Sequence, residues 1–322
     1  MALKFLDLDG RGLEIGPSYS PLVPKASGAR VETVDHADHA TLTAKYEAWG
    51  VPKEKIGAIE PVDHIWAGGS LVDLIPERES YDYIVASHFL EHTVDAVAFL
   101  TDCEALLADG GRLALVLPDK RYCFDRFQPL STVGDMVDAL YGRNSFHTAG
   151  TLLDHQAYSC RRGEYTAWDS ARTTDLSLQF PKLEHALEVI GAGLAQDSYH
   201  DIHHWKFTPT SFELLMRDLA TLNLQHFGPV GSFGTSGFEF FVTLGKGLPW
   251  PEADRLALLE RIEDELAEPL VTNLANLSLR RQLAEIRSQL AAIRASKSWR
   301  ATAPAAHARA ALRRLRPQRI RS

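Results

Sequence analysis

Short apolar runs alternate with a helix-like stretch through the first half of the chain, and this alternation constrains the fold more than any other feature. The pattern predicts strands at residues 12–16, 31–35, 64–67, 81–87 and 112–117. Between the last two, residues 95–107 carry apolar side chains at helical spacing and precede the turn signal Asp109-Gly110-Gly111. Such alternation predicts an α/β fold in which helices cover both faces of a mostly parallel sheet.

The second half is organised differently. From Arg121 to about Thr208 the periodicity gives way to an aromatic- and His-rich region. Thr208 and Pro209 form a helix start signal, which predicts a helix at 209–222, and residues 238–246 predict a strand. We therefore expect a main domain at 1–247 that contains an insertion at about 121–208.

A long helical pattern follows the stretch "GLPWPEADR", which marks a boundary. Its apolar residues recur at spacings of 3, 4 and 3, at Leu283, Ile286, Leu290 and Ile293. A coiled coil and a helix lying on its own domain both fit a seam of two heptads. We expect a helical or coiled-coil extension at 248–296, through which the chain would bind a partner or a second copy of itself, and a separate tail at 297–322.

Charge is divided unevenly between the tail and the rest of the chain. The tail carries eight Lys or Arg and no Asp or Glu, although the whole chain has a net charge of −8. The remainder therefore holds 26 basic against 42 acidic residues, a net charge of −16. This acidic charge on residues 1–296 argues against nucleic acid as a partner, because phosphate contacts need a basic surface. For the tail, contact with anionic membrane, contact with a partner and solvated disorder all remain open.

The cellular compartment is inferred from cysteines and apolar runs. Cys103, Cys123 and Cys160 are widely separated and odd in number, which predicts free thiols in a reducing compartment. No early apolar run is long enough for a signal peptide or a membrane span. We expect a cytoplasmic protein, with peripheral contact at the inner membrane if the tail binds lipid.

Polar residues follow the predicted strands, where an open α/β sheet binds its ligands. The strand "LEIG" turns at Gly16, and no further glycine of a pyrophosphate-binding fingerprint follows. Asp35 ends the second strand about twenty residues later, placed to accept hydrogen bonds from both ribose hydroxyls of an adenosine ligand. The strand "YDYIVAS" leads into Ser87, His88, Glu91 and His92. These positions predict a site for an adenosine ligand, and they leave open whether the first loop has lost its ligand or holds one that lacks phosphates.

At these residues the chain resembles class I S-adenosylmethionine-dependent methyltransferases, from about residue 12 to 125. More narrowly, "VDHADH", "IVASHFLEH", "PDKRYCFDRFQPLS" and "HDIHHWKFTPTSF" are similar to a bacterial group often found beside glycosyltransferases of surface-polysaccharide biosynthesis. This similarity covers most of residues 1–247. It implies a Rossmann-like sheet with an antiparallel last strand, S-adenosyl-L-methionine as cofactor, and O-methylation of a saccharide or polysaccharide intermediate. A stretch near the C-terminus also resembles the ends of bacterial glycosyltransferases, which implies a glycosyltransferase partner.

The resemblance assigns a cofactor site. Because S-adenosylmethionine has no phosphate, one glycine is enough for the chain to pass its methionine part. Glu14 would lie near the ligand's ammonium or orient the loop, and Ser70 and Leu71 would replace the acidic residue that commonly holds adenine. His88 and His92 are expected to brace the loop over the ligand. The expected cofactor-binding residues are Glu14, Gly16, Pro17, Asp35, His36, Ser70, Leu71, Ser87, His88 and His92.

The saccharide that would accept the methyl group is expected to bind at two polar clusters, covered by the insertion at about 121–208. In "SYHDIHHWKFTP", His203 is predicted to be the general base, either oriented by Asp201 or sharing a helical face with His200. A metal site from His200, His203, His204 and His155 is an alternative, but adjacent histidines point apart on most backbones and we expect no metal. Residues expected to bind the acceptor are Asp119, Lys120, Arg121, Tyr122 and His155. A structural ion pair of Lys120 or Arg121 with Asp119 or Asp125 is the competing interpretation.

Other functions remain open at this point. The chain could be a non-catalytic adenosyl-binding scaffold of a glycosyltransferase complex, or a methyltransferase for a small metabolite or lipid head group. A nicotinamide-dependent dehydrogenase is a third alternative, which the missing glycines of the first loop disfavour. The acceptor follows from family analogy alone, and therefore needs a direct test.

Overall fold

A computed structural model describes residues 1–169, 175–194 and 200–268, together with residues 278, 282, 285, 286, 288 and 289. The chain divides into a compact unit, Met1–Pro269, and a second unit, Leu270–Ser322. The first unit thus extends past the predicted domain end at 247, because the helix at 255–268 buries Leu258 and Ile262 against Leu214. Of the predicted heptad seam only Ile286 is described, and the tail at 297–322 lies outside the described residues.

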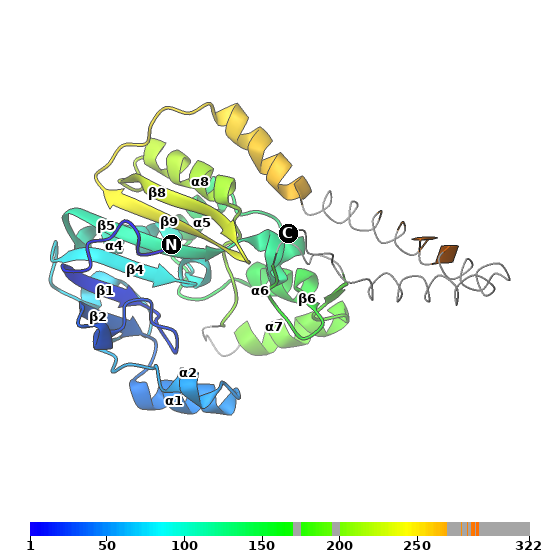
Figure 1. Cartoon of the computed structure of the whole chain (residues 1–322), viewed down its shortest axis with the longest axis horizontal. Helices are drawn as coiled ribbons and strands as arrows, with labels where there is room; N and C mark the ends of the chain where they lie inside the picture. The colour runs from blue at the N-terminus through cyan, green and yellow to red at the C-terminus, as the bar shows by residue number, and fades with distance from the viewer. Residues whose placement is uncertain are drawn as a thin grey trace, which may run out of the picture. The chain divides into compact units, whose positions relative to one another are not determined.

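A seven-stranded sheet with the order β3-β2-β1-β4-β5-β9-β8 forms the centre of the first unit (Figure 1). Strands β1 to β5 pair in parallel, whereas β9 runs antiparallel to both β5 and β8. The predicted fold class, a Rossmann-like sheet with an antiparallel last strand, is confirmed. The strands are β1 (Arg11–Ile15), β2 (Arg30–Asp35), β3 (His64–Ile65), β4 (Tyr81–Ser87), β5 (Leu107–Pro118), β8 (Phe227–Ser236) and β9 (Glu239–Lys246).

One face of the sheet is covered by helices. Alternate strand residues such as Leu13, Ile84 and Leu115 point to this face and share one large core cluster with apolar residues of the helices. Phe212 of α8 is an example, and it is almost fully buried. The helices that contribute are α3 (Leu71–Leu74), α4 (Ala96–Leu106), α5 (Val133–Gly142) and α8 (Pro209–Thr221).

The opposite face is covered largely by turns and loops, where the sequence predicted helices. Tyr83 and Val85 of β4 pack there against Val23 and the N-terminal segment 3–8. Three prolines between β1 and β2, at positions 17, 21 and 24, explain the difference, because proline removes a backbone donor and disfavours a helical residue before it. Only the 3-10 turn η1 (Lys25–Ser27) forms in this connection. Helices α1 (His39–Ala48) and α2 (Lys53–Ile56) pack against each other in a separate small cluster.

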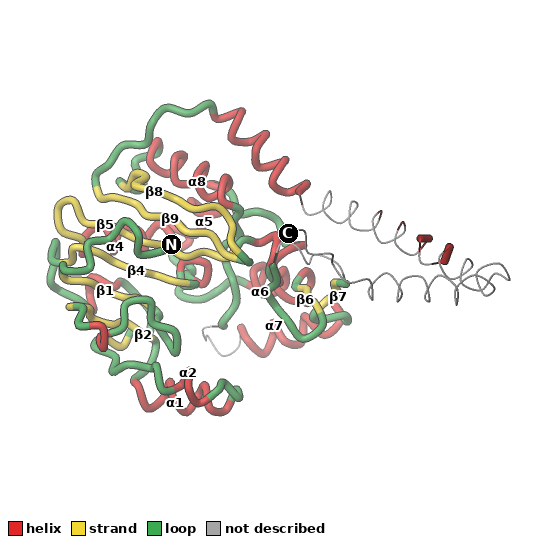
Figure 2. Tube along the Cα trace, viewed as in Figure 1, coloured by secondary structure: helices red, strands yellow, loops and turns green. Residues whose placement is uncertain are grey.

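The insertion between β5 and α8 consists of short helices and a small hairpin (Figure 2). Its elements are η3 (Lys120–Tyr122), η4 (Phe124–Phe127), α5, α6 (Ala149–Tyr158), β6 (Cys160–Arg162), β7 (Leu176–Leu178), η5 (Leu183–His185) and α7 (Ala186–Leu194). The three cysteines are buried and form no disulfide. Among the described residues, no helix combines the length and apolar character needed to cross a membrane.

Candidate active site

The turn after β1 requires glycine. Gly16 has a φ of +68°, a left-handed conformation that residues with a side chain rarely adopt. A Cβ atom at this position would lie 2.9 Å from Cδ2 of Phe89, in the loop after β4. The Gly16 N–H donates to the carbonyl of Val34 at 2.8 Å, which ties the turn to the end of β2. The close approach of the loops after β1 and β4 therefore leaves no room for a side chain here.

Asp35, the last residue of β2, lies directly beside this turn. Its Oδ2 accepts a hydrogen bond from Ser18 N at 2.9 Å, and its Oδ1 accepts one from His36 N at 2.8 Å. The ring nitrogen Nδ1 of His36 lies 2.7 Å from the same Oδ1, and this ring is half exposed. Asp35 itself is buried. Gly16 and Asp35 thus lie at the same edge of the sheet and border the same loop.

Glu14 orients the loop that follows the turn. Its carboxylate accepts hydrogen bonds from Leu22 N at 2.6 Å and Val23 N at 3.0 Å. Burial raises the pKa of Glu14, and the two backbone hydrogen bonds oppose that shift. Of the two roles expected for Glu14, the geometry therefore supports the orientation of the loop. Pro17 is buried in this same loop.

Ser70 and Leu71, expected at the adenine, are bound to another side chain. Asp102 of α4 accepts hydrogen bonds from Ser70 Oγ at 2.9 Å and from Leu71 N at 2.6 Å. Burial raises the pKa of Asp102, whereas these two hydrogen bonds lower it. Asp102 was not identified from the sequence because it lies in the middle of an amphipathic helix, where an acidic residue is ordinary.

His88 braces the loop after β4, which begins just beyond Ser87. Its Nε2 lies 2.8 Å from Oε2 of Glu239 on β9, and its Nδ1 lies 3.3 Å from Oε1 of Glu91. Burial alone would lower the pKa of His88, but the two carboxylates raise it to about 10. His88 is therefore an imidazolium at neutral pH, and the bracing role expected from the sequence agrees with these contacts.

His203 forms a buried pair with Asp125, a residue of η4. Nδ1 of His203 lies 2.5 Å from Oδ2 of Asp125, and both side chains are almost fully buried. Gln128 holds the other carboxylate oxygen by donating from Nε2 at 2.7 Å. Burial by itself raises the pKa of Asp125, but the adjacent imidazole lowers it overall. The imidazole is thereby fixed through Nδ1, which leaves Nε2 for chemistry.

The expected pairing of His203 with Asp201 is wrong. Asp201 instead lies 3.2 Å from Nδ1 of His92, and this contact lowers the pKa of Asp201 to about 2. The side chain of Asp201 is 55% exposed, whereas His203 is buried against Asp125. Although Asp201 and His203 are only two positions apart, one side chain lies at the surface and the other is buried. The rings of His92 and His203 nevertheless meet edge to face, with centroids 4.6 Å apart.

His155 and His200 border the same region. Phe124 lies between the imidazoles of His155 and His203, with ring-centroid distances of 5.7 and 4.4 Å. Burial lowers the pKa of His155 to about 4, so this imidazole is neutral at pH 7. Nε2 of His200 is buried and, among the described residues, has no hydrogen-bond partner. Phe124 thus connects the imidazoles of His155 and His203.

The other residues expected to bind the acceptor have intramolecular partners. Lys120 is buried and donates from Nζ to the carbonyl of Arg126 at 2.8 Å, and burial lowers the pKa of Lys120. Tyr122 lies in an apolar cluster with Cys160 and Trp168. Asp119 and Arg121 form a buried ion pair at 2.6 Å.

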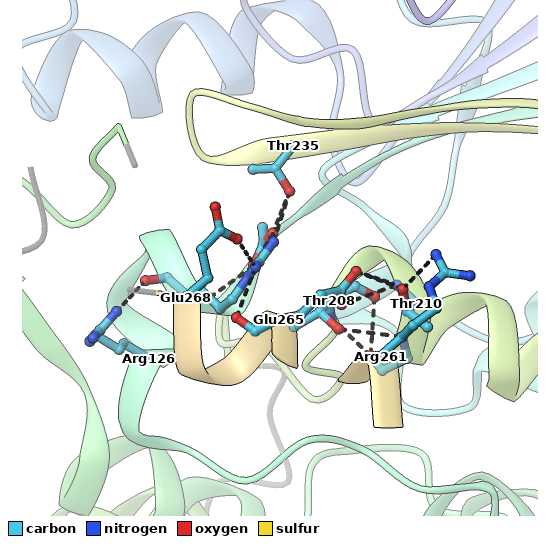
Figure 3. Close-up of polar contacts among 10 residues, drawn as sticks. Arg126, Thr208, Thr210, Thr235, Arg261, Glu265 and Glu268 are labelled. Atoms are coloured by element: carbon cyan, nitrogen blue, oxygen red, sulfur yellow. Dashed lines mark hydrogen bonds and ion pairs between the residues drawn. The ribbon is translucent and has the colours of Figure 1, made fainter. Parts of the chain in front are cut away.

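This ion pair belongs to a polar cluster under the helix at 255–268 (Figure 3). Arg121 donates to the carbonyl of Glu265 at 2.9 Å and to the carboxylate of Glu268 at 2.7 Å. Thr235 on β8 donates to Asp119 at 2.5 Å. A cavity of about 490 Å³ adjoins the cluster and is lined by Arg121, Trp250 and Glu265, among others. The structural ion pair, one of the two interpretations of Arg121, is the one that the geometry supports.

Comparisons with known proteins give structural neighbours only. No protein-family model matches the chain, and no curated protein matches it. A putative S-adenosylmethionine-dependent methyltransferase from Listeria monocytogenes is 11% identical over 76% of this chain and 94% of its own, with a TM-score of 0.39. A methyltransferase of the same kind from Methanosarcina mazei is 15% identical over 76% and 96%, with a TM-score of 0.36. Because both scores lie below 0.5, we base the function on the residues of this chain alone.

Proposed function

We propose that this chain is an S-adenosylmethionine-dependent methyltransferase that methylates a hydroxyl group of a saccharide or polysaccharide intermediate. The observation that carries the proposal is the adjacency of the Gly16 turn and the Asp35 carboxylate at the carboxyl edge of parallel strands. An open α/β sheet binds nucleoside ligands at this edge, and the carboxylate at the end of β2 is suited to a ribose diol. The saccharide is supported by the resemblance of "PDKRYCFDRFQPLS" to the polysaccharide-associated group.

The residues around Asp35 fit an adenosine diol after one small change. Oδ1 accepts two hydrogen bonds and Oδ2 accepts one, so only Oδ2 has a lone pair to spare. A diol that donates to both oxygens must displace the His36 ring from Oδ1. This ring is half exposed, and its Nε2 lies 3.1 Å from Nζ of Lys45, so an outward rotation would break only that surface contact while the backbone donors of Ser18 and His36 stay in place. Asp35 would hold the ribose, and the backbone at Gly16 would pass the methionine part.

The sulfonium methyl of the bound cofactor is already activated, so the protein must align the acceptor and promote loss of the hydroxyl proton. We assign these tasks to the histidine cluster at His92 and His203. Asp125 fixes the His203 ring through Nδ1, and Nε2 is the atom through which this residue would act. Arg121 has no part in this proposal, because its guanidinium is bound within the cluster under the helix at 255–268.

The test is methyl transfer from labelled S-adenosylmethionine to glycan precursors of the host, followed by mass analysis of the products. Asp35→Ala should abolish transfer. Asp38→Ala is the matched control, because Asp38 only caps α1 by accepting from Thr41 N at 2.8 Å. The control should retain transfer. Binding of the cofactor without any methylated product would contradict the proposal and favour a non-catalytic scaffold. A labelled metabolite or lipid, with no labelled glycan, would show that the acceptor is not a saccharide.

A further inference from the structure

Glu91 is the most unusual buried group in the described part of the chain. Its side chain has no exposed surface, and among the described residues neither carboxylate oxygen has a hydrogen bond of good geometry. Two imidazole nitrogens lie within ion-pair distance of Oε1, Nδ1 of His88 at 3.3 Å and Nε2 of His203 at 4.0 Å. A buried carboxylate without hydrogen bonds is costly unless a cation compensates it. His88 lies between two carboxylates, 3.3 Å from Glu91 and 2.8 Å from Glu239, so its single positive charge is shared and a further cation beside Glu91 would be stabilising.

Two imidazoles converge on this carboxylate. One nitrogen or oxygen atom from each of Glu91, His92 and His203 lies within 4.8 Å of the other two. Nδ1 of His203 is held by a hydrogen bond to Asp125 at 2.5 Å, and Nδ1 of His92 lies 3.2 Å from the carboxylate of Asp201 without a hydrogen bond of good geometry. Histidines that bind a metal ion usually have their second nitrogen held by a carboxylate or a carbonyl. This outer contact is thus present at His203, and a carboxylate faces the corresponding nitrogen of His92.

We propose that Glu91, His92 and His203 bind a divalent transition-metal ion. Two imidazoles and one carboxylate are the ligand set of catalytic zinc sites, which keep a further position open, and imidazole disfavours Mg²⁺ and Ca²⁺. Ligands on tetrahedral zinc lie roughly 3.3 Å apart. The 4.0 Å separation between Glu91 and His203 would therefore contract by less than 1 Å on binding.

A neighbouring trio is a weaker candidate. Cys123, Asp125 and His203 also bring potential ligand atoms within 4.8 Å of one another. Asp125, however, already accepts from Gln128 at 2.7 Å and lies 2.5 Å from Nδ1 of His203, so its oxygens are in use. Glu91 has no such bonds, which favours the first trio.

The trio lies near the protein surface on one side. The side chain of His92 is 21% exposed and that of Asp201 beside it is 55% exposed. The consequence for catalysis rests on the proposed function, whereas the ion site itself does not. An acceptor hydroxyl in the open position would lose its proton more readily, and that proton would pass to solvent water. Nε2 of His203 would then be a metal ligand, in place of the general base predicted from the sequence.

The experiment measures Zn²⁺ binding to the full, untagged chain after treatment with a chelator, by calorimetry and by metal analysis. Wild type should bind one Zn²⁺ per chain. Glu91→Gln, which keeps the size of the side chain, should weaken binding at least tenfold. His226→Ala is the matched control, because His226 is an exposed imidazole beside Glu104 at 3.0 Å and lies outside the trio. The control should bind Zn²⁺ as wild type does.

Two results would overturn the proposal: no stoichiometric Zn²⁺ binding by folded wild type, or equal affinity in wild type and Glu91→Gln. Substituted Co²⁺ supplies a second readout, because its visible absorption should report a four-coordinate site in wild type and change in Glu91→Gln. Titration of the same samples with S-adenosylmethionine separates the two proposals. Zn²⁺ binding without cofactor binding would leave the metal site standing and remove the proposed function.

Discussion

Replacement of Arg121 by methionine should destabilise the main unit strongly. The change removes every contact of the guanidinium, including the 2.6 Å ion pair with Asp119, and leaves this fully buried carboxylate with Thr235 Oγ1 and one backbone N–H. Removal of one partner from a buried pair costs about 3–5 kcal/mol, because the other charge stays desolvated. Urea unfolding followed by circular dichroism should therefore show a lower midpoint with an unchanged slope.

The matched control is Arg255→Met. Arg255 pairs with Asp218 at 2.9 Å, but its side chain is 61% exposed, and exposed pairs contribute little to stability. Equal urea midpoints in the two variants would show that the buried ion pair contributes no more to stability than the exposed one. An Arg121→Met protein of wild-type stability with an increased KM for the acceptor would instead restore the substrate-binding role predicted from the sequence.

Two further predictions concern the first turn and the buried histidines. Gly16→Ala should weaken cofactor binding in a calorimetric titration, because its Cβ would lie 2.9 Å from Phe89, whereas Gly28→Ala, with a similar φ of +87° and open space around it, should only lower stability by roughly 1 kcal/mol. Equal affinity of Gly16→Ala and Gly28→Ala for the cofactor would contradict the assignment of the Gly16 turn to the cofactor site. Burial lowers the pKa of His147 to about 3 and of His155 to about 4, so the folded state favours their neutral forms. The stability that they contribute is present above about pH 6.5 and is lost as the pH falls toward 4. Thermal unfolding should show a smaller loss over this range in His155→Gln than in wild type, and an identical loss would argue against a buried His155.

The central strands could be predicted because their signal is local. Residues 81–87 form an apolar run that is buried on both faces of a parallel sheet, and the observed strand β4 has the same bounds. Strand β8 was missed because Phe227–Ser236 is rich in glycine and serine. It is an edge strand held by pairing with β9, and this pairing does not appear in its own composition.

The cofactor half of the candidate site, at Gly16 and Asp35, could be predicted from local sequence, whereas the surroundings of His203 could not. Gly16 and Asp35 lie at the ends of adjacent parallel strands, so their proximity follows from the order of strands alone. The partners of His203 are distant in sequence: Asp125 is 78 residues away and Glu91 is 112 positions earlier. Asp201 was preferred as the partner because it is close in the chain, but backbone direction sends its side chain to the surface. The contact with Asp125 depends on how the insertion folds on itself, and the contact with Glu91 depends on how it packs on the loop after β4.

The cofactor site at Asp35 and Gly16 is tested most directly by a calorimetric titration of S-adenosylmethionine into wild type and Asp35→Ala. Wild type should show saturable binding at one site. Loss of two hydrogen bonds to a charged group, each worth about 1.5–3 kcal/mol, should weaken binding at least 100-fold in the variant. Equal affinity in the two proteins, or no binding to folded wild type, would contradict the assignment of Asp35 and Gly16 to a cofactor site.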